Sequence, residues 1–309
     1  MKRLLAPLLI LALACTAGAQ NAKPAKIEPP DAAWTAKIVG LAPKQPRVAP
    51  KSPRKVLVCS LATGYCHDVI PHVKVVMDTL AATGAFTVVH SNDVGMFAAD
   101  KLAAFDAVVL NNTCTKNPAR NWFIDTLAAD PSLDAAAREA RAAELEKNLI
   151  AFVEGGKGLV AVHGAVVFLN ESKDFNKLLG ASFKVHPKLQ PITLQPVEPS
   201  HPLLAAFGGK SFTHVDEPYL FHKTYADKDF RPLLEMEVDK LDADARKVMA
   251  GDRRFVSWIR HQGKGRVFYV SPSHHPNSYE RAELLQFYLD GLQYALGDLA
   301  VDDSVPAAR

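Results

Sequence analysis

One apolar run in the chain ends at a histidine flanked by small residues: Gly158-Leu159-Val160-Ala161-Val162-His163-Gly164-Ala165. The run before His163 has no polar alternation, which is typical of a strand covered by helices on both faces. Gly164 allows a sharp turn just after the imidazole. Because ligands of open parallel sheets bind outside the carboxyl ends of the strands, the run predicts a central parallel strand with His163 at the functional edge.

Segments typical of strands and helices alternate before this run. Apolar strands are predicted at residues 55–61, 86–90 and 105–112. A helix is predicted to start at Pro71, and another over residues 145–153 leads into the central strand. Residues 125–143 are rich in Ala and in charged residues, and they indicate an insertion or an extended start of that second helix. This alternation implies right-handed crossovers and a parallel sheet.

The pattern changes to shorter strands after residue 190. They are expected at residues 192–197, 212–221 and 233–238, followed by a hairpin of residues 255–259 and 266–271 and a final helix over residues 284–296. The chain therefore predicts an α/β fold, flavodoxin-like, with a central parallel sheet, helices on both faces and a C-terminal hairpin.

The N-terminus has the composition of an export signal. Residues 1–19 combine Lys2 and Arg3, an apolar run too short to span a membrane, and the small-residue pattern Ala17-Gly18-Ala19. We expect cleavage after Ala19 and a periplasmic or secreted protein, with lipidation at Cys15 as the alternative.

The remaining boundaries follow from composition. Residues 20–54 are rich in Pro, Lys and Ala and predict a tether or an extended arm, which Trp34 and Ile38 are able to pin in part to the body. Residues 55–298 form the predicted globular domain, and residues 299–309 a flexible tail. With 36 basic and 33 acidic residues and no basic block interleaved with aromatics, nucleic acid is not an expected partner.

Three cysteines remain after removal of the signal: Cys59, Cys66 and Cys114. Cys59 lies inside a predicted strand and is expected to be an inert core thiol. Cys66 and Cys114 both follow strand ends. Sequence leaves open whether they form a disulfide or stay as small thiols.

Several histidines follow a predicted strand. His67 comes after the first strand, His163 ends the central strand, and His274 follows the last one. Because carboxyl ends of parallel strands meet at one edge of a sheet, we expect these imidazoles to converge in one crevice. The alternative is that each is a structural histidine with its polar atoms satisfied in the core.

Other polar residues are candidates for the same crevice. His186 precedes Pro187, which restricts the backbone of His186 to extended conformations and so presents the imidazole in a fixed direction. Asp216-Glu217-Pro218-Tyr219 places two carboxylates at a strand end, where one of them is able to orient an imidazole, bind a metal or act as a general base. An ordinary solvated turn is the alternative.

Aromatic residues supply further candidates for substrate binding. Tyr219 follows the two carboxylates, and Trp258 and Tyr269 lie on the predicted hairpin. The hairpin pair is suited to face a sugar or to fill the core. A group of imidazoles with a carboxylate suits zinc or a similar divalent ion. The expected ligands are His67, His163 and His186, although the sequence has no compact H-E-x-x-H spacing.

Residues 54–297 resemble the ThuA-like (trehalose utilisation) family, which has the class I glutamine amidotransferase-like version of the flavodoxin fold. The resemblance rests on these matching stretches: Gly64-Tyr65-Cys66-His67-Asp68, Gly156-Lys157-Gly158-Leu159-Val160-Ala161-Val162-His163-Gly164-Ala165, Leu179-Gly180-Ala181-Ser182-Phe183 with His186-Pro187, His201-Pro202, Asp216-Glu217-Pro218-Tyr219, and Trp258 with Gly263-Lys264-Gly265-Arg266-Val267-Phe268-Tyr269.

The resemblance implies a role in carbohydrate metabolism. Amidotransferases of this fold carry a nucleophilic cysteine where this chain has His163, which argues against glutamine hydrolysis. The late histidine follows Ser273 where the family usually has glycine. The leading hypothesis is an exported enzyme that hydrolyses or eliminates a glycoside or keto-sugar. In this hypothesis His163 and His67 bind a divalent metal or the substrate, Asp216 or Glu217 is the base and His274 is the acid. The alternative is a non-catalytic sugar-binding or accessory protein of the cell envelope.

Overall fold

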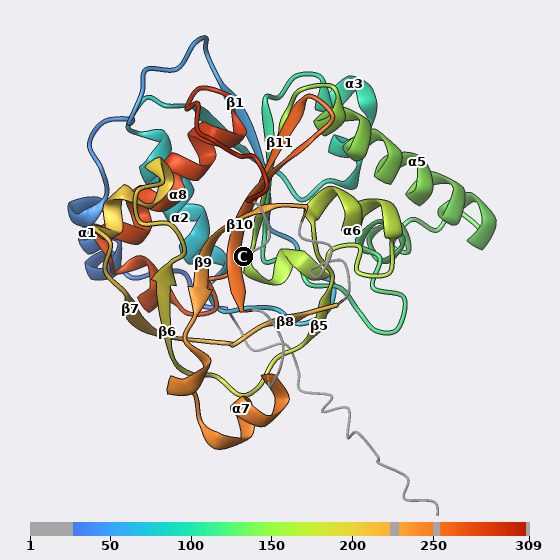
Figure 1. The fold of residues 1–309 in the computed structure, drawn as a ribbon. Coiled ribbons are helices and arrows are strands. Elements are labelled where there is room, and N and C mark those ends of the chain that lie inside the picture. Colours follow the sequence, from blue (N-terminus) through green and yellow to red (C-terminus); the bar gives the residue numbers. More distant parts are fainter. Residues whose placement is uncertain (1–26, 223–228, 250–253, 307–309) are drawn as a thin grey trace, which may run out of the picture.

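The computed structural model describes residues 27–222, 229–249 and 254–306. The predicted export signal, residues 1–19, lies outside them. A nine-stranded sheet with the order β2-β1-β3-β4-β11-β10-β9-β6-β7 runs through the described part of the chain (Figure 1). Its first five strands are parallel, and their order, with β11 as the fifth, is that of a flavodoxin-like sheet. The α/β fold predicted from sequence is confirmed.

The parallel strands have the predicted lengths within a few residues. They are β1 (Lys55–Cys59), β2 (Thr87–His90), β3 (Ala107–Asn111), β4 (Gly158–Val162) and β11 (Gly265–Val270). The central run is β4, which lies between β3 and β11 and pairs Val162 with both Asn111 and Val270. The carboxyl ends of these strands are therefore level.

The other strands extend this sheet in antiparallel fashion. They are β10 (Phe255–Gln262), β9 (Arg231–Met236), β6 (Gln190–Pro196) and β7 (Phe212–Asp216). The hairpin of β10 and β11 is confirmed. The expected single strand over residues 212–221 is divided: β7 ends at Asp216, and β8 (Leu220–Phe221) pairs with β5 (Phe183–Val185) in a separate small sheet. Pro218 has no N–H for a ladder bond, which favours the break between them.

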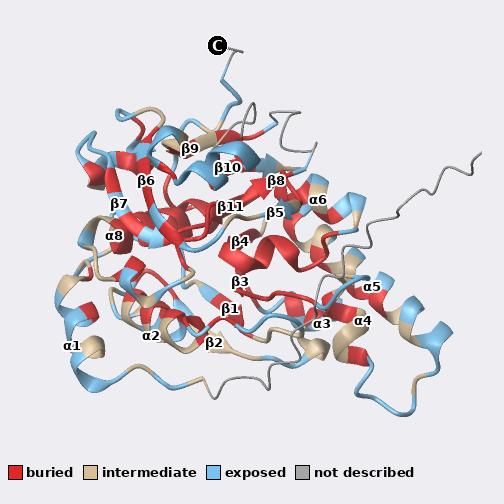
Figure 2. Ribbon diagram, turned by 90° about the horizontal axis from the view of Figure 1, so that it is seen from below, coloured by how far each residue is buried: buried red, intermediate tan, exposed pale blue. Residues whose placement is uncertain are grey.

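Helices cover both faces of the sheet, as predicted. Figure 1 places α1 (Ala32–Leu41), α2 (Ile70–Ala81) and α8 (Ala282–Ala295) on one side, and α3 (Ala99–Leu102), α5 (Ala135–Glu154) and α6 (Lys173–Leu179) on the other. Strand side chains alternate between the two layers: Val160 and Val162 pack with α2 and α8, whereas Leu159 and Ala161 pack with α5 and α6. Figure 2 shows the buried residues concentrated along the strands.

Shorter elements complete the chain. The segment expected as an insertion or a longer helix is resolved into α4 (Trp122–Leu127), capped by Asn121, and the start of α5, capped by Asp134. α7 (Ala243–Met249) follows β9. The 3-10 turns are η1 (Val94–Phe97), η2 (His163–Val167), η3 (Pro202–Phe207), η5 (Val238–Lys240) and η6 (Pro276–Tyr279).

The described part of the expected tether packs on the domain. Ile38 of α1 is fully buried in the core that contains α2 and α8. Further along, the Arg47 guanidinium donates to Asp290 at 2.8 Å and Arg54 pairs with the buried Asp298. Residues 31–54 are therefore held at several points by apolar contact and by ion pairs, which their Pro-rich composition does not reveal.

The expected flexible tail is also attached in its described part. Leu299 is buried, the Asp302 carbonyl contacts His201, and the Tyr294 hydroxyl donates to Asp303 at 2.8 Å. No helix in the described ranges is both long and apolar enough to cross a bilayer. Cys59, Cys66 and Cys114 are all free thiols, so the Cys66–Cys114 disulfide considered from sequence is absent from the described residues.

Candidate functional site

The functional edge predicted from β4 gathers side chains from several strand ends. His67 lies beyond β1, His163 directly follows β4, and His274 lies beyond β11. Their ring centroids are 4.9 Å apart for His67 and His163, 5.0 Å for His67 and His274, and 5.4 Å for His163 and His274. The three imidazoles that the strand pattern predicted to converge therefore do so.

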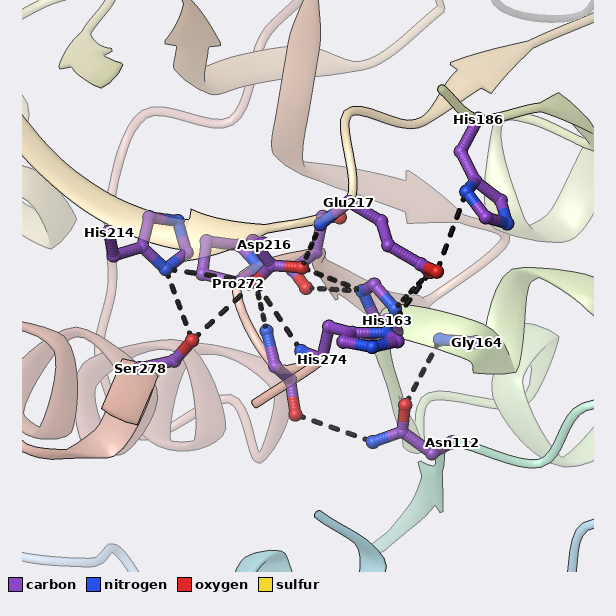
Figure 3. Close-up of polar contacts among 12 residues, drawn as sticks. Asn112, His163, Gly164, His186, His214, Asp216, Glu217, Pro272, His274 and Ser278 are labelled. Carbon is purple, nitrogen blue, oxygen red and sulfur yellow. Dashed lines mark hydrogen bonds and ion pairs between the residues drawn. The ribbon is translucent and has the colours of Figure 1, made fainter. Parts of the chain in front are cut away.

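Glu217 joins this imidazole group. One ligand atom from each of His67, His163, His274 and Glu217 lies within 4.8 Å of the other three. Figure 3 shows the Glu217 carboxylate directed at His163 and His274, with His186 on its far side. We call these four residues the His/Glu cluster. His186, expected as a metal ligand, is outside it, with Nδ1 3.5 Å from the other oxygen of Glu217.

His163 has a fixed orientation and tautomer. Its backbone has φ 46°, a left-handed conformation that non-glycine residues rarely adopt. Its Nδ1–H donates to the Ser271 carbonyl at 2.8 Å, so in the neutral ring Nε2 carries a lone pair. That Nε2 lies 3.3 Å from Glu217 Oε2, which is also an acceptor when ionised. Two acceptors this close are stabilised by a cation between them or by a second proton on His163.

His67 is buried without a polar partner. It is 2 % exposed, and neither ring nitrogen makes a hydrogen bond within the described residues. Burial lowers the pKa of His67 well below its ordinary value, and the neighbouring His163 and His274 lower it further. The ring is therefore neutral at pH 7, the form in which imidazole binds metals.

Glu217 and His274 influence each other's charge. Burial acts to raise the pKa of Glu217, but its close contacts with the His163 and His274 imidazoles outweigh burial and hold this pKa well below the ordinary range. Burial acts to lower the pKa of His274, but the Glu217 carboxylate, with Oε2 3.1 Å from Nδ1, raises it overall. That contact is not well directed as a hydrogen bond, because Nδ1 of His274 has no partner by hydrogen-bond geometry within the described residues. The carboxylate is ionised at neutral pH.

Asp216 lies behind the cluster and holds it in place. It is fully buried, and its Oδ2 accepts the main-chain N–H of Ser273 at 3.0 Å and of His274 at 3.4 Å. Its Oδ1 accepts the N–H of Glu217 at 2.7 Å. Because its oxygens are occupied and it does not line the pocket, Asp216 is a positioning residue and not the base considered from sequence.

A pocket of about 320 Å³ opens beside the cluster. Its lining includes Tyr65, His67, His186, Glu217 and Tyr219. The Tyr219 ring lies 4.4 Å from the His163 ring, and its role in substrate binding stays a prediction. A larger hollow of about 810 Å³ lies between α5 and α6, but none of the cluster residues lines it, so we assign the chemistry to the smaller pocket.

Trp258 and Tyr269 are core residues and not part of the pocket wall. Both are fully buried, and their rings stack 4.2 Å apart. The Trp258 indole N–H donates to the Leu179 carbonyl at 2.8 Å, and the Tyr269 hydroxyl donates to the His163 carbonyl at 3.2 Å. The expected sugar-facing role is corrected for both: on β10 and β11 these side chains point into the layer that contains α6.

Sequence reasoning missed Asn112 and the close packing at Gly164. Asn112, with φ 50°, accepts the Gly164 N–H at 3.4 Å and donates to Ser273 at 3.3 Å, so it connects the loops after β3, β4 and β11. A Cβ at Gly164 would lie 2.8 Å from Cε1 of His67 and 2.5 Å from Sγ of Cys114. The available signal was a polar pair, Asn111-Asn112, at the carboxyl end of an apolar strand.

A comparison with family models matches residues 55–295 to ThuA, described as trehalose utilisation. This chain belongs to the ThuA family. The match covers the sheet, the helices of both layers other than α1, and every residue of the His/Glu cluster. The family assignment made from sequence motifs is confirmed, and with it the link to trehalose utilisation.

Solved structures of ThuA-like proteins have the same fold. A ThuA-like protein from Parabacteroides merdae is 16% identical, with a TM-score of 0.57, over 82% of this chain and 94% of its own. One from Bacteroides uniformis is 17% identical, with a TM-score of 0.56, over 80% of this chain and 92% of its own. At these identities the likeness concerns the fold. The comparison with curated proteins gave no significant match.

Proposed function

We propose that this ThuA-family chain is an exported enzyme that hydrolyses or eliminates a glycoside or keto-sugar, with a divalent metal ion held by His67, His163 and His274. One observation carries the proposal: ligand atoms of these imidazoles and of Glu217 lie within 4.8 Å of one another beside a pocket of about 320 Å³. Pockets of this size take small molecules, and the family is linked to a disaccharide.

The donor set fits zinc or a similar divalent ion. Nδ1 of His163 is occupied by the Ser271 carbonyl, the usual arrangement for a metal-binding histidine, and this leaves Nε2 facing the cluster. Both nitrogens of His67 lack partners within the described residues. Catalytic zinc sites commonly have three protein ligands and an open position. Such an ion, when bound, polarises a carbonyl oxygen or lowers the pKa of a water molecule.

Glu217 and His186 are the proposed proton-transfer residues. Both line the pocket, and Glu217 is ionised at neutral pH because its pKa is lowered. Hydrolysis requires a base for water, and elimination requires one for the carbon beside a keto group. Nδ1 of His186, whose side chain is 36% exposed, lies 3.5 Å from Glu217 Oε1 and 2.9 Å from the Pro187 carbonyl, and this proximity supports proton exchange between His186 and Glu217. In this proposal His274 becomes a ligand and His186 the acid, the reverse of the expectation from sequence.

The test combines metal analysis with turnover. Untagged protein is expected to contain about one equivalent of metal. A panel of disaccharides and their 3-keto derivatives is expected to include a substrate, and a chelator should abolish turnover of that substrate. His163→Ala should lose metal and turnover, whereas Glu217→Gln should keep the metal and lose turnover. Metal-free, fully active protein would contradict the proposal. Sugar binding without turnover of any panel member would favour the non-catalytic binding protein.

Export is proposed from residues 1–19, which combine basic residues, an apolar run and a small-residue cleavage pattern. Fractionation of expressing cells and N-terminal sequencing test it. A mature chain that begins at Gln20 is expected outside the cytoplasm. A chain that begins at Cys15 would indicate a lipoprotein, and an unprocessed cytoplasmic chain would contradict export.

A further inference from the structure

The mouth of the pocket carries two cations with no acidic partner. Lys116 and Arg120, from the loop between β3 and α4, both line the pocket. Neither side chain forms an ion pair with any described residue. Glu217 is the acid in the pocket wall, and its oxygens are already in contact with His163, His186 and His274. The nearby Asp125 does not line the pocket and accepts the main-chain N–H of Lys116 and the hydroxyl of Thr63.

Arg120 is held in a strained and well-defined position. Its φ is 44°. Two other non-glycine residues in the described ranges have a positive φ, Asn112 and His163, and both belong to the site already described. Such backbone strain persists where the surrounding structure enforces it and is concentrated at functional sites. The Arg120 Nε donates to the Asn117 side chain at 2.6 Å, and its guanidinium carbon lies 5.3 Å from the centre of the Phe183 ring.

These contacts leave the terminal nitrogens of Arg120 available. The Nε bond and the stacking on Phe183 fix the plane of the guanidinium, while its two Nη groups have no partner among the described residues. A fixed guanidinium with free Nη groups is suited to a planar or tetrahedral oxyanion, which accepts two parallel N–H bonds. The ammonium of Lys116 adds a second, more flexible positive charge.

We propose that the substrate of this pocket is an acidic sugar, with its carboxylate or phosphate bound by Arg120 and Lys116. This inference rests on the proposed function for the sugar, but the anion site depends only on the two cations and their surroundings. Tyr65, whose ring is exposed and lies 4.7 Å from that of His67, offers an aromatic face beside the cations on which a sugar ring is able to stack.

Matched sugars with and without an acid group test the proposal. Calorimetry compares D-glucuronate and D-glucose 6-phosphate with D-glucose on the full-length mature protein. At least one of the acids is expected to bind about tenfold or more tightly than glucose, the scale of a charge-assisted contact. The acid that binds more tightly identifies the anion as carboxylate or phosphate.

Two variants and a control locate the preference. Arg120→Asn removes the guanidinium with a residue that tolerates the left-handed backbone, and Lys116→Gln removes an exposed charge. Each variant should reduce the ratio of acid affinity to glucose affinity. In Arg120→Asn this ratio should fall close to one, while the metal content is unchanged. Lys210→Gln, which removes an exposed cation outside the pocket, should leave the preference as in the wild type.

Equal affinity for acids and glucose, absence of acid binding, or a preference that survives in Arg120→Asn would each overturn the inference. The last result would place the acid on a metal ion or elsewhere. Failure of the metal and turnover tests with the acid preference intact would instead contradict the proposed function and leave the anion site standing.

Discussion

Asp216 Oδ2 accepts the main-chain N–H of Ser273 at 3.0 Å, which ties the end of β7 to the loop after β11. The next residues on the two segments are Glu217 and His274, which are in contact at 3.1 Å. One buried carboxylate therefore sets the separation of two members of the His/Glu cluster without touching the pocket.

Asp216→Ala is expected to weaken both folding and metal binding. It leaves the N–H groups of Glu217, Ser273 and His274 without their acceptor, and loss of a buried charged acceptor costs about 3 kcal/mol in the free energy of unfolding. Urea denaturation measures the stability, and metal titration at low temperature, where the variant is folded, measures affinity. Glu139→Ala, an exposed control on α5, should change neither. Wild-type metal affinity in folded Asp216→Ala would disprove the positioning role.

Gly164→Ala is expected to reduce metal content through a steric effect. Its Cβ would lie 2.5 Å from Cys114 Sγ and 2.8 Å from His67 Cε1, so one of these side chains has to move. Elemental analysis should give clearly less than the wild-type stoichiometry. Gly40→Ala in α1, where a Cβ meets nothing within 4 Å, is the control and should be neutral or slightly stabilising. Full occupancy in Gly164→Ala would place the ion elsewhere.

His201 predicts a loss of stability on mild acidification. Burial, the largest cause, lowers its pKa below the ordinary value of 6.5. Its Nδ1 accepts the Leu203 N–H, which a second ring proton would prevent. Below about pH 6.5 the unfolded chain binds a proton that the folded chain does not, so stability falls as pH decreases through this range.

His201→Asn keeps a capping side chain and removes the titrating ring. Urea denaturation between pH 5 and pH 8 should give a flatter pH profile for His201→Asn than for the wild type. His67 and His214 have lowered pKa values as well and preserve part of the slope in both proteins. Identical slopes would show that His201 is not a neutral, buried group in the folded state.

Trp258→Phe separates the core role from a sugar-binding role. The variant loses the indole N–H that donates to the Leu179 carbonyl, and leaving a buried carbonyl unpaired costs about 1–3 kcal/mol in the free energy of unfolding. Affinity for any sugar that the wild type binds should be unchanged, because Trp258 is 0 % exposed and outside the pocket. Weaker sugar binding with unaltered stability would reverse this correction.

The arrangement of the sheet was predictable from sequence because parallel strands buried on both faces have continuous apolar runs. The same reasoning located His67, His163 and His274, since a histidine after such a strand has to lie at one edge of the sheet. The roles of Trp258 and Tyr269 stayed open, because the sequence of a strand does not reveal which of its two faces meets helices and which meets ligand.

The choice between Asp216 and Glu217 was beyond the sequence for another reason. Side chains of adjacent residues in a strand point in opposite directions, and the chain bends at Pro218. Which of the two carboxylates faces the interior and which faces the pocket therefore depends on the register of β7. The sequence indicated that Ile38 is able to pin the arm to the body, but it did not predict the helix α1, because a short helix is stabilised by its partner, here α2, more than by its own composition.

The His/Glu cluster draws on both halves of the chain, since His67 and His163 precede the antiparallel extension of the sheet and Glu217 and His274 follow its first strands. No nascent or partly translocated chain that lacks β11 contains the complete set. If the chain is exported before it folds and binds a metal as proposed, the ions of the compartment in which folding finishes will determine which metal it acquires.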